Sequence, residues 1–277
     1  MTKIMRLYPP FEPEIELNGL YLSHAMQNTE SDETFVFTNF ISTLDGRISL
    51  PDPETGKHRV PPKAANPNDL RLFYELIARA DVIVTTARHL RAVAKGHQPD
   101  LLNLDTEACN DLVSWRRQKG LTEQPAIAVI SKDLDLPEKA KITHSDTPIL
   151  VFSWRDVDER EEKRLRANGY ELICCGEGEE IDGGQLVDLL QKNGYRNIYS
   201  IAGPRIFTAL LNADRIDRLY LTLTHLMLGG ENYNTITYGK GLEAPNGFTL
   251  RELYYDAEEP HDSGQMFAVF DRISRRD

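Results

Sequence analysis

Short apolar runs alternate with amphipathic segments along most of the chain, and this alternation begins near residue 34. The interior runs are apolar at every position, as in Val82–Val84, which is typical of a sheet covered by helices on both faces. Strands are predicted in this way at Thr34–Ser42, Asp81–Thr86, Ala126–Ser131, Ile149–Ser153, Glu171–Cys175, Asn197–Ala202 and Arg218–Leu228. Two further runs, Phe248–Tyr255 and Gln265–Ile273, follow without a helix between them and predict an antiparallel pair. The pattern predicts an α/β fold: a three-layer sandwich whose mostly parallel sheet has an antiparallel C-terminal edge.

Residues that start and stop helices support this reading. Asn66 is suited to cap a helix that has Pro67 at its first position, and Pro204 begins another helix. Helices predicted at Thr106–Lys119, Val157–Asn168 and Gln185–Asn193 are each followed by a glycine, which favours the turn that ends a helix. The connections over residues 46–65 and 87–105 are longer than ordinary loops, so we expect them to act as binding loops or lids.

The N-terminal residues differ from the rest of the chain in composition and periodicity. Residues 1–33 are rich in proline and glutamate and show weak periodicity, which predicts an extension packed on the domain. Residues 34–277 contain no internal repeat and no linker, so we expect a single domain there.

Composition narrows the class of protein. The chain has 277 residues and a formal net charge of −11, which argues against binding to nucleic acid. No apolar run approaches the roughly 20 residues needed to cross a bilayer, and no signal peptide is evident. Three cysteines, two of them adjacent, make a poor disulfide framework and fit a reducing cytoplasm. No histidine, cysteine or carboxylate cluster has zinc-site spacing, so we expect no metal.

Two basic clusters stand out in this acidic chain, and both follow predicted strands. The cluster residues are Arg47, Lys57, His58, Arg59 and Lys63 in the first loop, and Arg88, His89, Arg91, Lys95 and His97 in the second. Ligands of open α/β sheets bind at the carboxyl ends of the strands, where these cations would hold phosphate groups. The alternative is that both are solvated loops.

Three short motifs add candidate chemistry. Ala202-Gly203-Pro204 joins a strand to a helix whose N-terminus suits a phosphate, with Arg205 beside it, although a plain tight turn has the same pattern. Gly229-Gly230 is either a point of close backbone approach or the end of a strand. Asp45 is either a proton donor or relay, or part of an ordinary Asp-Gly turn. The run Gly176–Glu180 is rejected as a phosphate loop because its carboxylates would repel phosphate.

The order of several motifs resembles a known family. They are Leu44-Asp45-Gly46-Arg47-Ile48 after Asn39 and Ser42, Asp69–Phe73, Ala78–Val84, Gly169–Ile173, Ala202–Pro204, Ile216–Leu219 and Leu228–Gly230. This set is similar to the reductase domain of riboflavin biosynthesis, the C-terminal half of a bifunctional deaminase–reductase. The resemblance covers roughly residues 34–273.

The resemblance implies a dihydrofolate reductase-like fold, a homodimer and an NADPH-dependent oxidoreductase. Its substrate would be a phosphorylated pyrimidine, whose ribosylamino side chain is reduced to a ribitylamino chain, or a related pterin. Asn39 and Asp45 would face the substrate and the nicotinamide, with Asp45 managing the proton. Ser42, Arg47 and Arg59 would bind substrate. The cofactor would lie against Thr85, Thr86, Ser131, Gly203, Pro204, Arg205, Gly229 and Gly230.

The chain departs from the family pattern at positions that contact the cofactor. Thr85-Thr86 replaces a Gly-Ala pair, Ala202 replaces a glycine, and Thr224-His225 stands where proline is usual. These changes favour an alternative, a non-catalytic paralogue with a degenerate cofactor site that acts as a binding or regulatory module. A nucleotide-binding enzyme of another reaction class on the same sheet is a further alternative.

Overall fold

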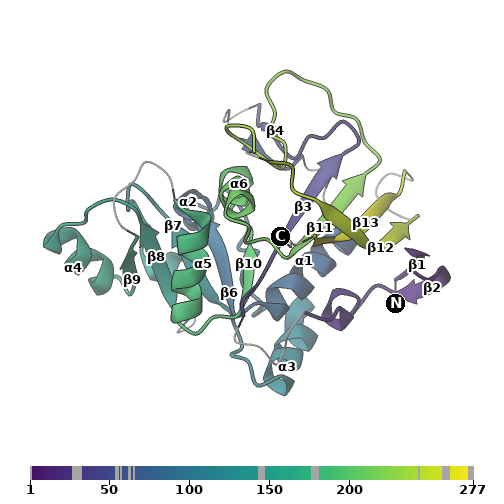
Figure 1. Cartoon of the computed structure of the whole chain (residues 1–277). Helices are drawn as coiled ribbons and strands as arrows, with labels where there is room; N and C mark the ends of the chain where they lie inside the picture. The colour runs from purple at the N-terminus through teal and green to yellow at the C-terminus, as the bar shows by residue number, and fades with distance from the viewer. Residues whose placement is uncertain are drawn as a thin grey trace. The chain divides into compact units, whose positions relative to one another are not determined.

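The computed structural model describes residues 2–26, 33–53, 56, 58–61, 64, 66–142, 147–175, 181–242, 244–257 and 263–273 (Figure 1). The chain divides into two compact units. The first comprises Met1–Gln27, Val36–Phe73 and Gly203–Asp277, and the second comprises Asn28–Phe35 and Tyr74–Ala202. Each unit contains both strands and helices.

The second unit contains a parallel sheet with the strand order β10-β6-β7-β8-β9. The strands are β6 (Val82–Thr86), β7 (Ala126–Ile130), β8 (Ile149–Ser153), β9 (Glu171–Cys174) and β10 (Asn197–Ser200). Val82, Ile83 and Val84 are fully buried, because a central strand covered on both faces must be apolar at successive positions. All five strands were predicted at nearly these bounds.

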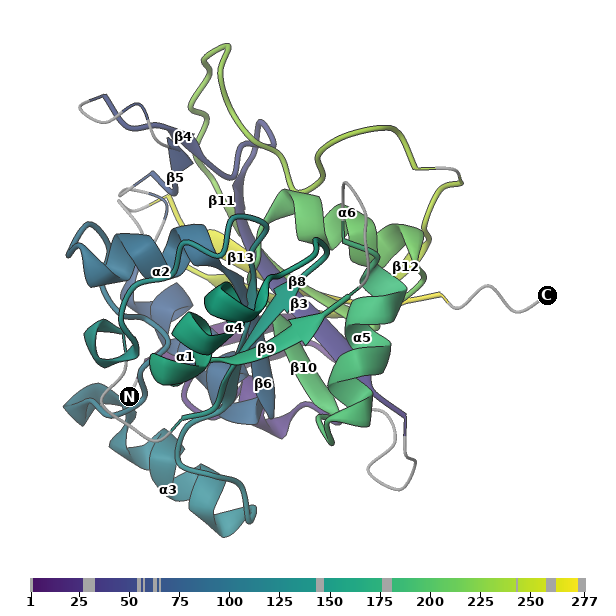
Figure 2. The same ribbon diagram turned by 90° about the vertical axis from the view of Figure 1, so that its left-hand side faces the viewer.

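The helices of the second unit are α2 (Ala87–Ala94), α3 (Asn110–Gln118), α4 (Glu159–Ala167) and α5 (Gly183–Lys192), with short 3₁₀ turns at Glu107–Cys109 and Lys139–Lys141. Three of them, α2, α4 and α5, begin at a residue whose side chain caps them. Asp158 and Asp182 accept hydrogen bonds from the first-turn N–H groups of α4 and α5. Figure 2 shows these helices around β8 and β9, and α4 packs against β9.

One expectation about this unit was wrong. The connection over residues 87–105 is not a long loop, because α2 begins directly after β6. Thr86 serves as the last strand residue and as the N-cap of α2, where its side chain accepts a hydrogen bond from His89 N. The basic residues Arg88, His89 and Arg91 therefore lie on a helix.

The first unit contains a mixed sheet with the order β2-β1-β12-β13-β11-β3. The strands are β1 (Lys3–Tyr8), β2 (Glu12–Glu16), β3 (Phe35–Thr43), β11 (Arg218–Thr224), β12 (Phe248–Asp256) and β13 (Gln265–Arg272), and β4 (Leu50–Pro51) pairs with β5 (His58–Arg59). Strands β3 and β11 are parallel, and every other pair here is antiparallel. With the parallel sheet of the second unit, this confirms the predicted α/β fold with an antiparallel C-terminal edge.

Two helices cover opposite faces of this sheet. On one face, Thr222 of β11 donates a hydrogen bond to Asp69 in the first turn of α1 (Pro67–Arg79). On the other, Phe40 of β3 packs edge-on against Phe207 of α6 (Pro204–Asn212), with ring centroids 5.1 Å apart. Because side chains alternate along a strand, these two contacts assign every residue of β3 and β11 to a face.

The N-terminal segment adds two strands to this sheet. Strand β1 pairs with β12 along its length, and a 3₁₀ turn at Tyr21–Ser23 follows. The division of the chain into an extension over residues 1–33 and a single domain over 34–277 stays a prediction. Among the described residues, no helix is long and apolar enough to cross a membrane.

Candidate functional site

The turn after β3 holds the candidate catalytic carboxylate, Asp45. Its Oδ2 accepts hydrogen bonds from Leu228 N at 3.0 Å and Gly229 N at 2.8 Å, and its Oδ1 accepts one from the Thr43 hydroxyl. Both carboxylate oxygens therefore have partners within the first unit. Asp45 joins the turn after β3 to the loop after β11, which is also held by Leu44 N donating to Leu226 O at 2.9 Å.

This environment fixes the charge of Asp45. The hydrogen bonds from Thr43 and from the backbone of Gly229 and Leu228, with the nearby Arg47 guanidinium, lower the pKa of Asp45 to about 2. The side chain is thus ionised at neutral pH and has no proton to donate. The geometry gives it a positioning role, and its assignment as the catalytic group stays a prediction.

The Arg47 side chain also binds to this turn and to the Gly229-Gly230 loop. Its Nη1 lies 2.9 Å from Asp45 Oδ2 and donates to Asp45 O, and its Nη2 donates to Gly230 O at 3.1 Å. The guanidinium lies over the ring of Tyr233, 4.2 Å from its centroid. Gly229 and Gly230 have φ of +66° and +91°, which only glycine adopts readily, and this allows their backbone to approach Arg47 and Asp45.

The rest of the first basic loop folds against the loop that follows Gly230. His58 Nδ1 lies 3.0 Å from Asn234 Nδ2, and His58 Nε2 lies 3.2 Å from Asn232 Oδ1. Arg59 pairs with Asp52 at 2.7 Å, and its side chain is 52% exposed, so this pair is open to solvent. Lys57 and Lys63 lie outside the described residues, as does Gly176–Glu180.

The two candidates on β3 do not lie together. Asn39 is in register with Tyr220, so it shares the α1 face with Thr43, whereas Ser42 lies on the α6 face with Phe40. Asn39 is half-buried, and Ser42 is buried and donates to Thr43 O at 3.1 Å. Strand alternation, which a motif-based comparison ignores, separates them.

The N-terminus of α6 is suited to an anion. Gly203, with φ of +84°, is the N-cap and provides no capping side chain, and Pro204 stands at the first position. The exposed Arg205 has no hydrogen-bond or ion-pair partner among the described residues, and its guanidinium lies 4.6 Å from the centroid of the Tyr238 ring. Unpaired N–H groups, the helix dipole and a cation meet here.

Three predicted cofactor residues lie at the carboxyl edge of the parallel sheet in the second unit. Thr86 pairs with Ile130 in the β6–β7 register, so Thr86 and Ser131 end adjacent strands. Their hydroxyls are already engaged: Thr86 caps α2, and Ser131 Oγ accepts from Leu134 N at 3.0 Å. Thr85 is buried. The Thr86 and Ser131 hydroxyl oxygens both act as acceptors in these bonds, so each hydroxyl can still donate its proton to a ligand.

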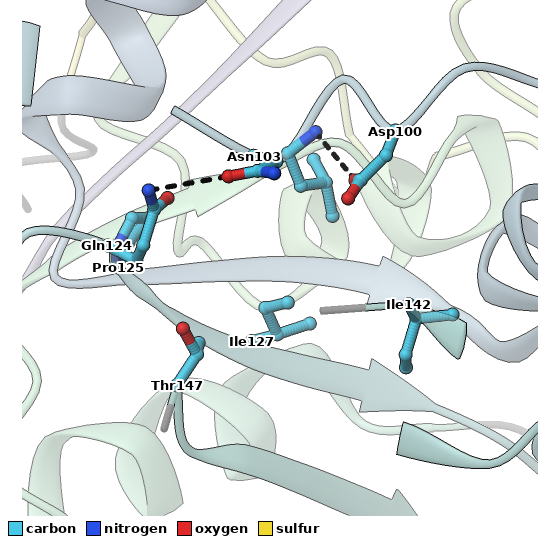
Figure 3. A pocket seen from close by; sticks show the side chains of 8 residues that line it. Asp100, Asn103, Gln124, Pro125, Ile127, Ile142 and Thr147 are labelled. Carbon is cyan, nitrogen blue, oxygen red and sulfur yellow. Dashed lines mark hydrogen bonds between the residues drawn. The ribbon is translucent and has the colours of Figure 1, made fainter. Parts of the chain in front are cut away.

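A small cavity in the second unit lies elsewhere (Figure 3). Its volume is about 10 Å³, room for roughly one water molecule, and it is lined by Asp100, Leu102, Asn103, Gln124, Pro125, Ile127, Ile142 and Thr147. Gln124 and Pro125 precede β7, so the cavity is at the amino end of that strand. It is too small for a dinucleotide and lies away from the carboxyl edge.

Comparison with known proteins identifies the family. Residues 34–258 match the model of the RibD C-terminal domain, which is more than half of the chain. The chain belongs to the RibD C-terminal domain family. The family is one of riboflavin-biosynthesis reductases, and solved structures with this fold include two such reductases.

Solved structures share the fold at low sequence identity. A pyrimidine reductase-like protein from Corynebacterium diphtheriae is 18% identical, covers 89% of this chain and 94% of its own, and has a TM-score of 0.63. The riboflavin biosynthesis reductase Rib7 of Saccharomyces cerevisiae is 15% identical, with 91% and 96% covered and a TM-score of 0.56. Acinetobacter baumannii RibD is 14% identical, with a TM-score of 0.59; the match covers 88% of this chain and 59% of RibD.

Sequence reasoning missed several side chains that this family member uses to build the site. Tyr233 and Tyr238, which cover Arg47 and Arg205, lie in a loop without periodicity and gave no signal. Thr43 stood just beyond the predicted strand Thr34–Ser42 and was given no role, whereas β3 extends to Thr43. Asp69 was noted within a motif and given no role, although its place three residues after the cap Asn66 is a recognisable signal.

Proposed function

We propose that the protein is an NADPH-dependent reductase of a phosphorylated pyrimidine, similar to 5-amino-6-(5-phosphoribosylamino)uracil, or of a related pterin. Membership of a reductase family supports the reaction class. The observation that carries the cofactor assignment is the uncapped N-terminus of α6 with Arg205 beside it. A dinucleotide diphosphate needs this combination of N–H donors and positive charge.

The residues present fit such a cofactor, and each has a definite task. In the first unit, Gly203, Pro204 and Arg205 would hold a diphosphate. In the second unit, the edge formed by Thr85, Thr86 and Ser131 is a separate candidate for contact with the adenosine half. The nicotinamide, when bound, supplies the hydride. Asp45 keeps the Gly229-Gly230 turn in place through its carboxylate, and Arg47 supports the same turn.

The preference for NADPH over NADH rests on a second cation. Arg91 already has a partner, because its Nη1 donates a hydrogen bond to the backbone oxygen of Asp135 at 2.6 Å. Arg88 is exposed in the first turn of α2 and has no polar partner among the described residues. Arg88 is therefore our candidate for the 2′-phosphate, and Arg59 and Asn39 are candidates for the substrate side.

Titration of the purified protein with NADPH and NADH, followed by nicotinamide fluorescence, tests the proposal. Micromolar binding of NADPH and weaker binding of NADH are expected, followed by NADPH oxidation with a phosphorylated aminopyrimidine or a pterin. Absence of binding at millimolar concentration would instead support the non-catalytic paralogue. That alternative is supported by the Thr86 and Ser131 hydroxyls, because each already accepts a hydrogen bond from the backbone of its own unit.

Two further properties belong to the same proposal. The resemblance to the family implies a homodimer, which sedimentation equilibrium would test directly. The three cysteines are unpaired thiols, with Cys174 exposed, and this supports a reducing compartment such as the cytoplasm.

A further inference from the structure

The carboxyl group of Asp69 occupies a special position in the first unit. Asp69 lies in the first turn of α1, where its backbone N–H donates to Asn66 Oδ1 at 2.9 Å. Its side chain reaches the sheet, where Thr222 Oγ1 donates to Asp69 Oδ1 at 2.6 Å. Thr222 is in register with Ile41 of β3, so Asp69 lies over the face that also presents Asn39 and Thr43.

In the part of the chain that the structure describes, no cation pairs with this carboxyl. Among the described residues, Thr222 is its only side-chain partner, and Asp69 Oδ2 has none. Around it, α1 contributes Asn68 and β11 contributes Thr222 and Thr224, all neutral, while β13 contributes neutral Gln265. Strand β12 brings two further carboxyl groups to this face. Asp256 accepts hydrogen bonds from Asn68 at 2.8 Å and Gln265 at 3.0 Å, and Glu252 lies against Tyr254 and His24.

The surroundings of Asp69 and Asp256 differ. Asp256 accepts hydrogen bonds from Asn68 of α1 and Gln265 of β13 and so joins the helix to the sheet, which is a structural role. Asp69 is desolvated with one hydroxyl donor, and burial raises its pKa to about 6. A group of this kind keeps its proton up to about pH 6, well above an ordinary carboxyl, and releases it when a stronger acceptor approaches.

We propose that Asp69 is the general acid of the reduction. The assignment rests on the proposed reductase function. In the reaction a carbon–nitrogen double bond of the substrate, as in the open-chain imine of a ribosylamine or in a pterin ring, takes up a hydride at carbon. The nitrogen takes the proton of the Asp69 carboxyl, the C=N π bond becomes a C–H and an N–H bond, and the resulting carboxylate is reprotonated from solvent. Thr222 is the positioning residue, since its hydroxyl fixes Oδ1 and leaves Oδ2 for the transfer.

Another carboxyl of the first unit provides a matched control. Asp217 precedes β11, at the opposite end of the strand from Thr224, and accepts a hydrogen bond from Val36 N at 2.6 Å. Burial also raises the pKa of Asp217 to about 6. Asp217 therefore titrates in the same range as Asp69, but its hydrogen bond serves the backbone of β3.

The test compares Asp69→Asn, Thr222→Val and Asp217→Asn in the full-length protein, with NADPH binding and kcat/KM measured across pH 4.5–8.5, a range that brackets the pKa of about 6. Wild-type kcat/KM should fall as the pH rises through this pKa. D69N should lower kcat/KM by roughly 10²–10⁴-fold, remove this limb and leave NADPH affinity unchanged. T222V, which loses the hydroxyl that stabilises the carboxylate, should shift the limb to higher pH, and D217N should behave as wild type.

The outcomes separate this assignment from the function on which it rests. A D69N variant that binds NADPH and keeps the wild-type rate and pH profile would overturn the role of Asp69 while leaving the reductase intact. Failure of the wild-type protein to bind NADPH would overturn the proposed function. Carboxyl ¹³C NMR on the resting protein is an independent readout: a resonance that titrates near pH 6 and disappears in D69N supports the assignment, and its absence contradicts it.

Discussion

Asp45 and Gly229 are 184 positions apart in the chain, and the Asp45 carboxylate accepts a hydrogen bond from Gly229 N at 2.8 Å. This bond joins the turn after β3 to the loop after β11. The motifs Leu44–Ile48 and Leu228–Gly230 are far apart in the sequence, but their loops are joined by hydrogen bonds in the fold. Arg47 completes this connection by donating to Gly230 O from the other side.

Replacing Asp45 tests whether it positions the turn. In Asp45→Ala the N–H groups of Leu228 and Gly229 lose their acceptor, so their amide hydrogen exchange should accelerate, and kcat/KM should fall on the order of 100-fold through misplacement of the turn. Because the pKa of Asp45 is about 2, the acidic form is absent near neutral pH, and the pH limb near 6 should persist in the variant. Loss of that limb in D45A would make Asp45, not Asp69, the proton donor.

Arg205 should contribute directly to cofactor affinity. Arg205→Ala removes a charge-assisted contact to the diphosphate, worth about 1.5–3 kcal/mol, so NADPH affinity should fall roughly 10- to 100-fold with little change in unfolding temperature. The affinity of the wild type should also weaken as salt is added. Arg160→Ala, a change at an exposed arginine on α4, is the matched control. Equal NADPH affinities for both variants would move the diphosphate away from α6.

Asp69 and Asp217 should make stability depend on pH in an unusual direction. Burial raises both pKa values to about 6, above the roughly 3.9 of an unfolded chain, so the folded state retains protons that the unfolded state releases. The free energy of unfolding should therefore decrease as the pH rises from about 4 to 6. Each carboxylate costs up to about 3 kcal/mol above that range, since one pKa unit corresponds to about 1.4 kcal/mol.

The corresponding variants separate stability from catalysis. D69N and D217N should each raise the free energy of unfolding at pH 7, by about 1–3 kcal/mol, in urea titrations. Only D69N should also reduce activity, because a buried proton donor is retained at a cost in stability. A D69N protein less stable than wild type at pH 7 would show that Asp69 serves the helix N-terminus instead.

The strands of the sheet could be predicted from the sequence. They are buried on both faces and therefore appear as continuous apolar runs, as in Val82–Val84. The prediction failed at α2, where Thr86 ends a strand and caps a helix without an intervening loop. The family resemblance assigned both Asn39 and Ser42 to the substrate. The alternation of side chains along β3 directs them to opposite faces of the sheet. The partners of Asp69 and Asp45 come from β11 and its loop, more than 150 positions away, and local patterns carry no information about such pairs.

Arg116 should matter for stability and not for function. It is 1% exposed, and its guanidinium donates to Ala78 O at 2.8 Å, Ala80 O at 2.7 Å and Thr122 O at 2.6 Å, closing the C-terminus of α1. Burial lowers its pKa to about 10, so it remains charged at neutral pH. Arg116→Met fills most of the volume but leaves the buried carbonyls of Ala78 and Ala80 without this donor, and should lower the free energy of unfolding by about 3 kcal/mol. Its neighbour Arg117 pairs with Glu123 on the exposed surface, so Arg117→Met should change stability by less than about 1 kcal/mol in the same urea titration. Equal effects of the two changes would mean that the carbonyls find water in place of Arg116, and that α1 is capped by solvent.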